Sequence, residues 1–206
     1  MIVHKLLAEI LANRKENELT VVSICGAADL GKSYISKKIS ELLTESNIKT
    51  NHLTMDSYLL DREMRKKKEL SGYDIEAYNQ KEVLKDLIAL KNGESINFKP
   101  YNHNKGTSGL IFSEMEPSDI LIFDGLHSMH PSFVPYVNVT IFLYTKDVLL
   151  KNIRSEADII KRKYTTDYSK SISESEFELY KSNVYPYKKQ ADYIIYLKDK
   201  WNYYLE

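Results

Sequence analysis

The sequence predicts an α/β protein built on a doubly wound, mostly parallel β-sheet. The first observation is a glycine-rich stretch, 26–33, that stands between an apolar, β-branched segment and a segment with helical periodicity. The second is that buried-strand patterns alternate with helical patterns along the chain, which is the order that builds parallel sheets. The buried-strand patterns lie at 19–25, 49–55, 120–123, 137–143 and 193–197. Because the sequence has no internal repeat and no linker, we expect a single domain over residues 1–206.

The stretch 26–33 has the pattern G-x-x-x-x-G-K-S of a phosphate-binding P-loop. Its glycines let successive backbone N–H groups turn toward an anion, and the N-terminus of the following helix adds partial positive charge. We expect Lys32 to reach the β- and γ-phosphates of a nucleotide and the Ser33 hydroxyl to hold Mg²⁺. Asp29 places a negative charge inside this loop, so we expect its side chain to point outward. The residues expected to bind the nucleotide are Gly26, Ala27, Ala28, Asp29, Leu30, Gly31, Lys32, Ser33 and Tyr34.

The composition limits the partners and the compartment. Lysine plus arginine and aspartate plus glutamate each number 29, so the formal net charge is zero and gives no argument for nucleic acid or an anionic membrane. Cys25 is the only cysteine, which excludes an internal disulfide and a cysteine-rich zinc site. The first residues lack a signal-peptide pattern, and no apolar run reaches the about 18 residues of a membrane span. We therefore expect a cytoplasmic protein with no nucleic-acid or membrane partner, and a homo-oligomer is left open.

Two carboxylates stand at the ends of predicted strands, on the rim where open α/β sheets bind ligands. Asp124 follows four apolar residues in the Walker B pattern, so we expect it to hold Mg²⁺ directly or through water. Asp56 follows 49–55, a strand that we expect beside the P-loop strand, and could accept a proton from a substrate hydroxyl. A helix or turn cap is the alternative for Asp56. His127 and His130 come next after Asp124; they are a possible metal pair, although hydrogen-bond donors are commoner at such positions.

Helical patterns cover three other segments. Residues 3–15 predict an amphipathic packing helix, and the nearly all-charged stretch 61–70 predicts a solvated helix or loop rather than a nucleic-acid site. Residues 79–91 predict a helix that ends at Asn92 and Gly93. The apolar face expected for this last helix consists of Val83, Leu84, Leu87 and Ile88.

The remaining segments are an edge hairpin and a long helical region. Residues 95–109 predict a short edge strand and a loop, with 110–112 as the hairpin partner of that strand. Residues 146–190 are helical, charged and interrupted, and basic side chains gather in their first part. These basic residues are Arg154, Lys161, Arg162 and Lys163.

Taken together, the motifs of this chain resemble those of the uridine kinase and phosphoribulokinase family of P-loop kinases, and most closely those of uridine kinase. The likeness covers about residues 19–197 and rests on order and spacing as well as on the P-loop. The matching segments are 55–58, 72–74, 77–78, 100–101, 124–127, Arg154, Asp158, Arg162, 185–187 and 191–195.

The resemblance implies a P-loop kinase fold with a helical lid at about 146–190 and a magnesium-dependent transfer of the γ-phosphoryl group of ATP to a hydroxyl. It implies that Asp56 is the general base and that Lys32, Arg154 and Arg162 act on the phosphates. Asp124 matches the acidic residue at the metal, where uridine kinases more often have glutamate. A nucleoside such as uridine or cytidine is the first candidate acceptor. We expect the acceptor to be surrounded by Tyr58, Tyr73, Asp74, Tyr101, His103 and His127, although ordinary packing is an equal alternative for the tyrosines.

Departures from the family pattern keep other functions open. Ala157 and Tyr164 stand where the family has lid arginines, and His103 is the nearest histidine to a family histidine expected at about Gly106. The acceptor could therefore be pantothenate, a sugar phosphate or another vitamin-like alcohol. A nucleotide-binding regulator without turnover is the alternative from a different class. A GTPase switch is disfavoured because the sequence has no Asn-Lys-x-Asp motif, for which 145–147 is a poor substitute.

Overall fold

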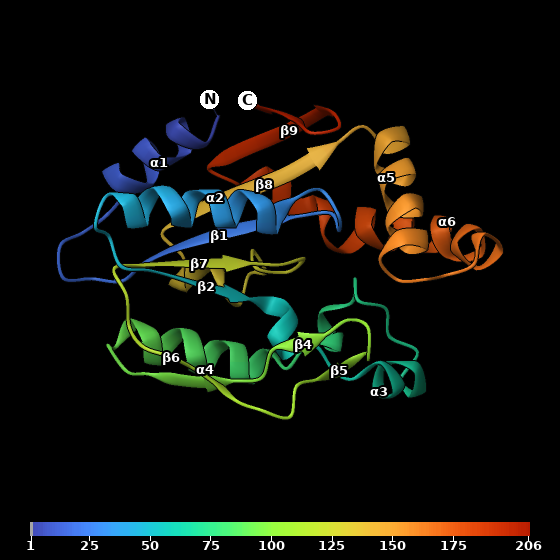
Figure 1. Cartoon of the computed structure of the whole chain (residues 1–206), viewed down its shortest axis with the longest axis horizontal. Coiled ribbons are helices and arrows are strands. Elements are labelled where there is room, and N and C mark those ends of the chain that lie inside the picture. Colours follow the sequence, from blue (N-terminus) through green and yellow to red (C-terminus); the bar gives the residue numbers. More distant parts are fainter. Residues whose placement is uncertain (1) are drawn as a thin grey trace.

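The computed structural model describes residues 2–206 and is organised around one six-stranded sheet (Figure 1). The spatial order of the strands is β10-β9-β8-β1-β7-β2. Five of them run parallel, and β10 pairs antiparallel with β9 at one edge. The strands are β1 (Thr20–Gly26), β2 (Thr50–Thr54), β7 (Ile120–Asp124), β8 (Val139–Thr145), β9 (Tyr193–Asp199) and β10 (Asn202–Leu205). The predicted α/β fold with a mostly parallel sheet is confirmed.

Both faces of the sheet are covered, which explains why its central strands are apolar without alternation. Every residue of β1 and β7 is buried. Val22 and Ile122 belong to one core cluster, whereas Val21 and Phe123 belong to the other. On the first face pack α1 (Ile2–Ala12) and α2 (Lys32–Glu45), and on the second packs α4 (Gln80–Lys91).

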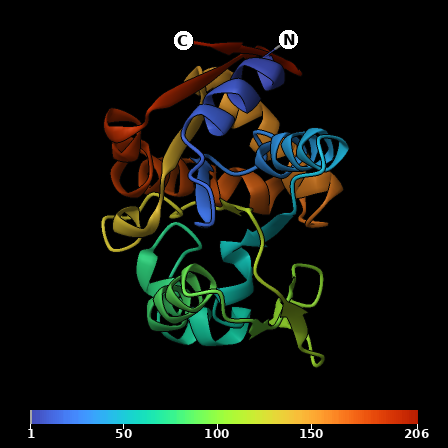
Figure 2. The same cartoon turned by 90° about the vertical axis from the view of Figure 1, so that its left-hand side faces the viewer.

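The helices of the predicted lid, α5 (Asp147–Ile160) and α6 (Thr166–Asn183), pack on each other beyond the carboxyl end of β8. Figure 2 shows the segments from about 55 to 115 at one end of the molecule and both chain termini at the opposite end. Among residues 2–206, no helix is long and apolar enough to span a membrane.

The strand before Asp56 does not neighbour the P-loop strand, so that prediction is wrong. β7 lies between β1 and β2, and its residue Asp124 is in register with Ile24 on one side and Thr54 on the other. The connection from β1 through α2 leads to β2, which lies two strand positions away from β1. The position between them is occupied by β7, which comes later in the chain. Asp56 still follows the carboxyl end of β2, in a short 3₁₀ helix (Met55–Tyr58), so it stays on the same rim of the sheet.

The helix predicted at 79–91 forms as α4 and ends at Asn92, and Gly93 follows with φ +80°. Its buried face differs from the prediction. Ile88 is 39% exposed, whereas Leu90 and Asp86 are buried with Val83 and Leu87. The buried Asp86 carboxylate accepts a hydrogen bond from the Tyr58 hydroxyl at 2.8 Å, so a polar residue replaces an apolar one on this face.

The edge hairpin also differs from the prediction. The partner of β3 (Ile96–Phe98) is β6 (Ser113–Met115), not 110–112. A second small hairpin, β4 (Tyr101–Asn102) with β5 (Thr107–Ser108), is closed by the bond from Gly109 N to Pro100 O at 2.8 Å. Residues 110–112 therefore connect the two hairpins, and Leu110 is 95% exposed there. The charged stretch 61–70 contains a short helix, α3 (Arg62–Lys67).

Candidate active site

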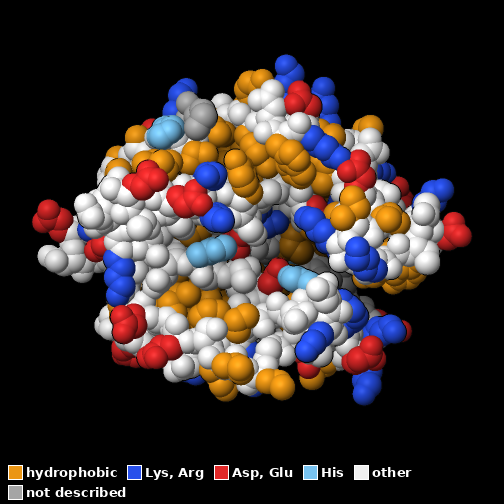
Figure 3. Space-filling view, in the orientation of Figure 1, with side chains coloured by type: hydrophobic (Ala, Val, Ile, Leu, Met, Phe, Trp, Pro, Cys, Tyr) orange, Lys and Arg blue, Asp and Glu red, His pale blue; other side chains and the backbone are white. Residues whose placement is uncertain are grey.

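A cleft of about 860 Å³ opens at the carboxyl end of the sheet. Its walls are the P-loop, the segment 146–190 and residues from 54–104, and the turn before β10 closes one end. Figure 3 shows this hollow near the centre of the face, with basic and histidine side chains at its rim. Residues from distant parts of the sequence therefore meet in one site.

The P-loop has the strained backbone that its glycines allow. Gly26 has φ +135°, and a Cβ atom there would lie 2.2 Å from the carbonyl oxygen of Leu143. Lys32 begins α2, and its Nζ donates to the carbonyl oxygens of Gly26 and Ala27 at 3.0 and 2.9 Å. The ammonium group is thus held across the mouth of the loop, where phosphate oxygens can replace the carbonyls.

Asp124 and Ser33 form a site that fits a magnesium ion. The Ser33 hydroxyl donates to Asp124 Oδ2 at 3.2 Å. The other carboxylate oxygen, Oδ1, is buried and has no hydrogen-bond partner among the described residues, although His52 Nε2 lies 3.2 Å away. Burial alone would raise the pKa of Asp124, but His52 and Lys32 outweigh it and lower the pKa. A charged carboxylate with a spare oxygen beside a hydroxyl suits Mg²⁺, which takes one or two protein ligands and completes its shell with water and phosphate.

The histidines after Asp124 do not form a metal pair. No group of three or more His, Cys, Asp or Glu residues suited to a metal exists within 2–206. Both ring nitrogens of His127 are engaged, at 3.0 Å from the Tyr187 hydroxyl and 3.0 Å from the Tyr73 carbonyl oxygen. Burial lowers the pKa of His127 to about 4, so the ring is neutral at neutral pH. His127 lies behind the wall of the cleft rather than on it.

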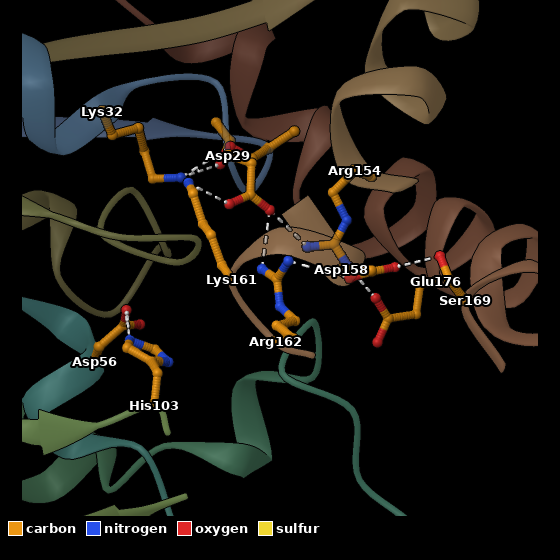
Figure 4. A network of polar contacts seen from close by, with 12 residues as sticks. Asp29, Lys32, Asp56, His103, Arg154, Asp158, Lys161, Arg162, Ser169 and Glu176 are labelled. Carbon is orange, nitrogen blue, oxygen red and sulfur yellow. Dashed lines mark hydrogen bonds and ion pairs between the residues drawn. The ribbon is translucent and has the colours of Figure 1, made fainter. Parts of the chain in front are cut away.

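Asp29 does not point outward, so that expectation is wrong. Its carboxylate is 8% exposed and accepts from Arg162 Nη2 at 2.9 Å, Lys161 Nζ at 3.0 Å and Arg154 Nη1 at 3.3 Å. We call these four residues the Asp29 cluster (Figure 4). Burial alone would raise the pKa of Asp29, but Arg162 and Arg154 outweigh it and hold the pKa below its ordinary value. The prediction failed because it considered the loop without the cations that 146–190 brings to it.

Further acids fix the arginines of this cluster. Arg154 also pairs with Glu176, and Arg162 Nη1 lies 3.1 Å from Asp158 Oδ1. Asp158 in turn accepts a hydrogen bond from Ser169 at 2.9 Å. Sequence reasoning did not identify Glu176, which stands in a charged helix without a distinguishing motif.

Asp56 faces the cluster from the opposite wall of the cleft (Figure 4). The carboxylate is about one-third exposed, and Oδ2 lies 3.1 Å from His103 Nε2. The cap of its 3₁₀ turn is the Thr54 hydroxyl, which accepts from Asp56 N at 3.4 Å. The Asp56 side chain is therefore not the cap of this turn and is available to a ligand.

Only some of the residues expected around the acceptor line the cleft. Tyr101 and His103 do, and Tyr73 does although it is 4% exposed. The Tyr58 hydroxyl is engaged with Asp86, and Asp74 accepts from Ser71 N at 2.8 Å and from Asn183 at 3.1 Å. Tyr58, Asp74 and His127 are therefore structural in this arrangement.

Several lining residues were not identified from the sequence. Some come from β10, a strand that the sequence analysis did not predict. The Tyr203 hydroxyl donates to the Leu30 carbonyl at 3.0 Å and lies above Gly31, beside Trp201. The other unpredicted lining residues that concern the acceptor are Arg62, Arg65 and Tyr78.

The sheet topology, the P-loop and the acid at the end of the neighbouring strand define a P-loop protein of the α/β class. Comparison with known families goes further: residues 21–200 match the model of the phosphoribulokinase / uridine kinase family. The chain belongs to this family.

Its relatives carry several different activities in their names. Phosphoribulokinase of Synechocystis sp. is 26% identical over 184 residues, which cover 87% of this chain and 54% of the relative. Pantothenate kinase of Mannheimia succiniciproducens is 26% identical, with 82% of this chain and 60% of the relative covered. Uridine kinase of Ligilactobacillus salivarius is 25% identical, with 90% and 88% covered. The chain thus spans little more than half the length of some of these proteins, and the expected preference for the uridine kinase branch is not supported.

Solved structures share the fold at lower identity. A structure described as a fructose transport system kinase from Silicibacter sp. TM1040 superposes with a TM-score of 0.78 at 16% identity, covering 92% of this chain and 95% of the other. Phosphoribulokinase from Rhodobacter spheroides gives 0.72 at 15% identity, with 90% and 73% covered.

Proposed function

We propose that this protein is an ATP- and magnesium-dependent kinase that phosphorylates a hydroxyl group of a small molecule. The observation that carries the proposal is the placement of a partly exposed carboxylate, Asp56, across one cleft from the P-loop. Family membership supports a phosphotransferase that uses ATP. The geometry adds a base on the side of the cleft from which an acceptor would approach the γ-phosphate.

In the proposed reaction, the acceptor hydroxyl gives its proton to Asp56 and its oxygen forms a bond to the γ-phosphorus. The bond from that phosphorus to the bridging oxygen breaks, and ADP leaves. His103, 3.1 Å from Asp56, orients the carboxylate. Lys32, Arg154 and Arg162 stabilise the charge on the transferred group. Ser33 and Asp124 would hold magnesium, which neutralises phosphate charge when bound.

The identity of the acceptor is a separate part of the proposal. A nucleoside is one candidate, since Tyr101 offers an aromatic ring on the acceptor wall. Asp74, which was expected beside the acceptor, is not available to it in this arrangement, because its carboxylate accepts hydrogen bonds from Ser71 N and Asn183. Other small alcohols are therefore equally compatible with these contacts.

A nucleotide-binding regulator without turnover is the second candidate. The favouring observation is that Arg154, Lys161 and Arg162 all pair with Asp29, an acid of the P-loop itself. Ala157 is buried in α5, and Tyr164 packs its ring on Tyr168 with centroids 5.0 Å apart, so neither replaces a missing arginine. Turnover decides between the two candidates.

The test is ADP release from ATP with a panel of alcohols, comparing the wild type with Asp56→Asn. The amide keeps the shape of the carboxylate and removes its basicity, so we expect kcat to fall roughly 100-fold or more with ATP affinity unchanged. Glu63→Gln, on the exposed side of α3, is the matched control and should behave as the wild type. Near wild-type turnover by Asp56→Asn would refute the base, and ATP binding without turnover on any alcohol would favour the regulator.

A further inference from the structure

Two arginines of α3 turn away from solvent and into the acceptor side of the cleft. The sequence 61–70 predicts a solvated, charged segment, and most of it is exposed. Arg62 and Arg65 are the exceptions in α3, because both are half-buried and both line the cleft. Their spacing of three residues places them on the same face of the helix. This short helix therefore presents two cations to the space beside Asp56.

Neither guanidinium has an acidic partner. Within residues 2–206, no carboxylate oxygen lies within 4.0 Å of a guanidinium nitrogen of Arg62 or Arg65. Arg62 Nη2 donates to the carbonyl oxygen of His103 at 2.6 Å. Arg65 donates to neutral oxygens only, from Nε to Leu60 O at 3.1 Å and from Nη2 to the Tyr101 hydroxyl at 3.3 Å. Arg154 and Arg162 differ from these two residues, because both pair with the Asp29 carboxylate.

The neutral contacts hold the two guanidiniums in place and leave donors free. The Arg62 side chain packs on Gly106, where a Cβ atom would come within 2.8 Å of it. Arg65 Nη1 makes no hydrogen bond to the part of the chain that the structure describes, and it lies 3.9 Å from where a Cβ of Gly72 would stand. A guanidinium has five N–H donors and cannot lose its charge. The unused donors and the unpaired charge of these two arginines would therefore be satisfied by an anion.

Asp56 does not meet this need. It lines the same cleft as Arg62 and Arg65, but its carboxylate is engaged with His103 at 3.1 Å. The proposed base and the two cations therefore share the cleft without pairing with each other.

We infer that the acceptor is an anionic alcohol, with a phosphate monoester or a carboxylate that Arg62 and Arg65 bind while its hydroxyl lies at Asp56. The inference rests on the proposed kinase function and deepens it. A guanidinium binds either group with two parallel hydrogen bonds, and a partly buried, preorganised pair loses little entropy on binding. An uncharged nucleoside would leave both charges without a partner.

Binding is measured first, so that the result does not depend on turnover. The protein is saturated with magnesium and a non-hydrolysable ATP analogue, which fills the P-loop, and titrated calorimetrically with matched probes. D-ribose 5-phosphate against D-ribose tests the phosphate, and pantothenate against pantothenol tests the carboxylate. We expect at least one anionic probe to bind 10-fold or more tightly than its neutral partner. Which pair shows the difference identifies the group.

Variants test whether the two arginines are responsible. Arg62→Gln and Arg65→Gln should each weaken the preferred anionic probe 10-fold or more, and Arg65→Lys should restore part of the loss. Lys66→Gln and Lys67→Gln, on the exposed side of α3, are the controls and should leave its affinity unchanged. Affinity for the ATP analogue should be unaltered in all of them.

The outcomes separate this inference from the proposed function. Equal binding within both pairs, failure of both anionic probes to bind, or anion binding that is insensitive to Arg62 and Arg65 would overturn the inference. ADP release with a neutral alcohol alone would also overturn it while supporting the kinase. Preferential binding of an anion without ADP release would support the anion site and count against turnover.

Discussion

The Asp29 carboxylate accepts a hydrogen bond from Arg162 at 2.9 Å, although 133 residues separate them in the sequence. An acid of the P-loop thereby lies among the cations of 146–190, where the proposed function would place a phosphate group. The pair is 8% and 29% exposed, so solvent screens it only partly. If Arg154 and Arg162 bind the phosphates as proposed, nucleotide and this contact compete for the same guanidinium groups.

Removing the charge of Asp29 tests this competition. We expect Asp29→Asn to bind magnesium and the ATP analogue about 10-fold more tightly, because the cations no longer have to leave a carboxylate. Calorimetry gives the affinity. Asp147→Asn, which removes an exposed partner of Lys181 in the same segment, is the control. Weaker binding by Asp29→Asn would instead make Asp29 a residue that positions the arginines.

The same contact predicts how 146–190 responds to nucleotide. In the wild type, amide exchange around Arg154 and Arg162 should slow when a bisubstrate analogue binds, since closure excludes water from the site. In Asp29→Asn without ligand, exchange in this region should be faster than in the wild type. Protection that is the same in all three states would argue that 146–190 is not a lid.

For the P-loop, we predict substitutions that affect nucleotide binding but not the stability of the fold. Lys32→Ala and Ser33→Ala should lose affinity for magnesium nucleotide or turnover. Their melting temperatures should match the wild type, because both residues stand in the first turn of α2, where the P-loop ends, and outside the apolar core. ATP titration and thermal melts measure the two effects. Wild-type affinity and turnover in both variants would show that the motif does not bind phosphate here.

Asp124→Asn addresses the magnesium site. The amide removes the charge beside Ser33, so activity should require a higher magnesium concentration than in the wild type. Activity is measured against magnesium concentration at fixed ATP. An unshifted curve would assign Asp124 a purely structural role at the end of β7.

His127 predicts a pH dependence of stability. Its pKa falls from 6.5 to about 4 on folding, so between these values the unfolded chain binds more protons than the folded protein. The free energy of unfolding should therefore fall as the pH falls from about 7 to about 4, by about 3 kcal/mol from this residue. Urea unfolding of the wild type and His127→Gln over this range checks it. The difference between their unfolding free energies should shrink toward low pH, and a constant difference would contradict the prediction.

Local motifs predicted that the P-loop and Asp124 lie together. The P-loop and Asp124 are defined by short stretches in which strand, loop and helix follow directly, and the structure places Ser33 and Asp124 in contact. Contacts between distant segments were not predictable in the same way. The position of β7 beside β1 and the cations around Asp29 depend on packing that no local pattern records.

The part of the cleft proposed to bind the acceptor was harder to predict for the same reason. The charges of 61–70 give no sign that Arg62 and Arg65 face inward, because that orientation depends on contacts with Leu60, Tyr101 and His103. Tyr58 and His127 lie within family-like motifs but use their polar atoms for internal bonds. Short aromatic-rich strands such as β10 are also difficult to predict from sequence, because a segment of four residues is too short to show a clear periodicity.

The single thiol of the chain has a practical consequence. Cys25 is completely buried in β1, its Sγ donates to Leu126 O at 3.0 Å, and burial raises its pKa to about 12. At neutral pH it is a protonated thiol that reagents in solution do not reach, so the native chain offers no background to maleimide dyes. Ser171→Cys, at an exposed position of α6, would therefore carry a fluorophore at one defined point. Movement of α6 relative to the rest of the protein can then be followed by fluorescence without first removing a cysteine.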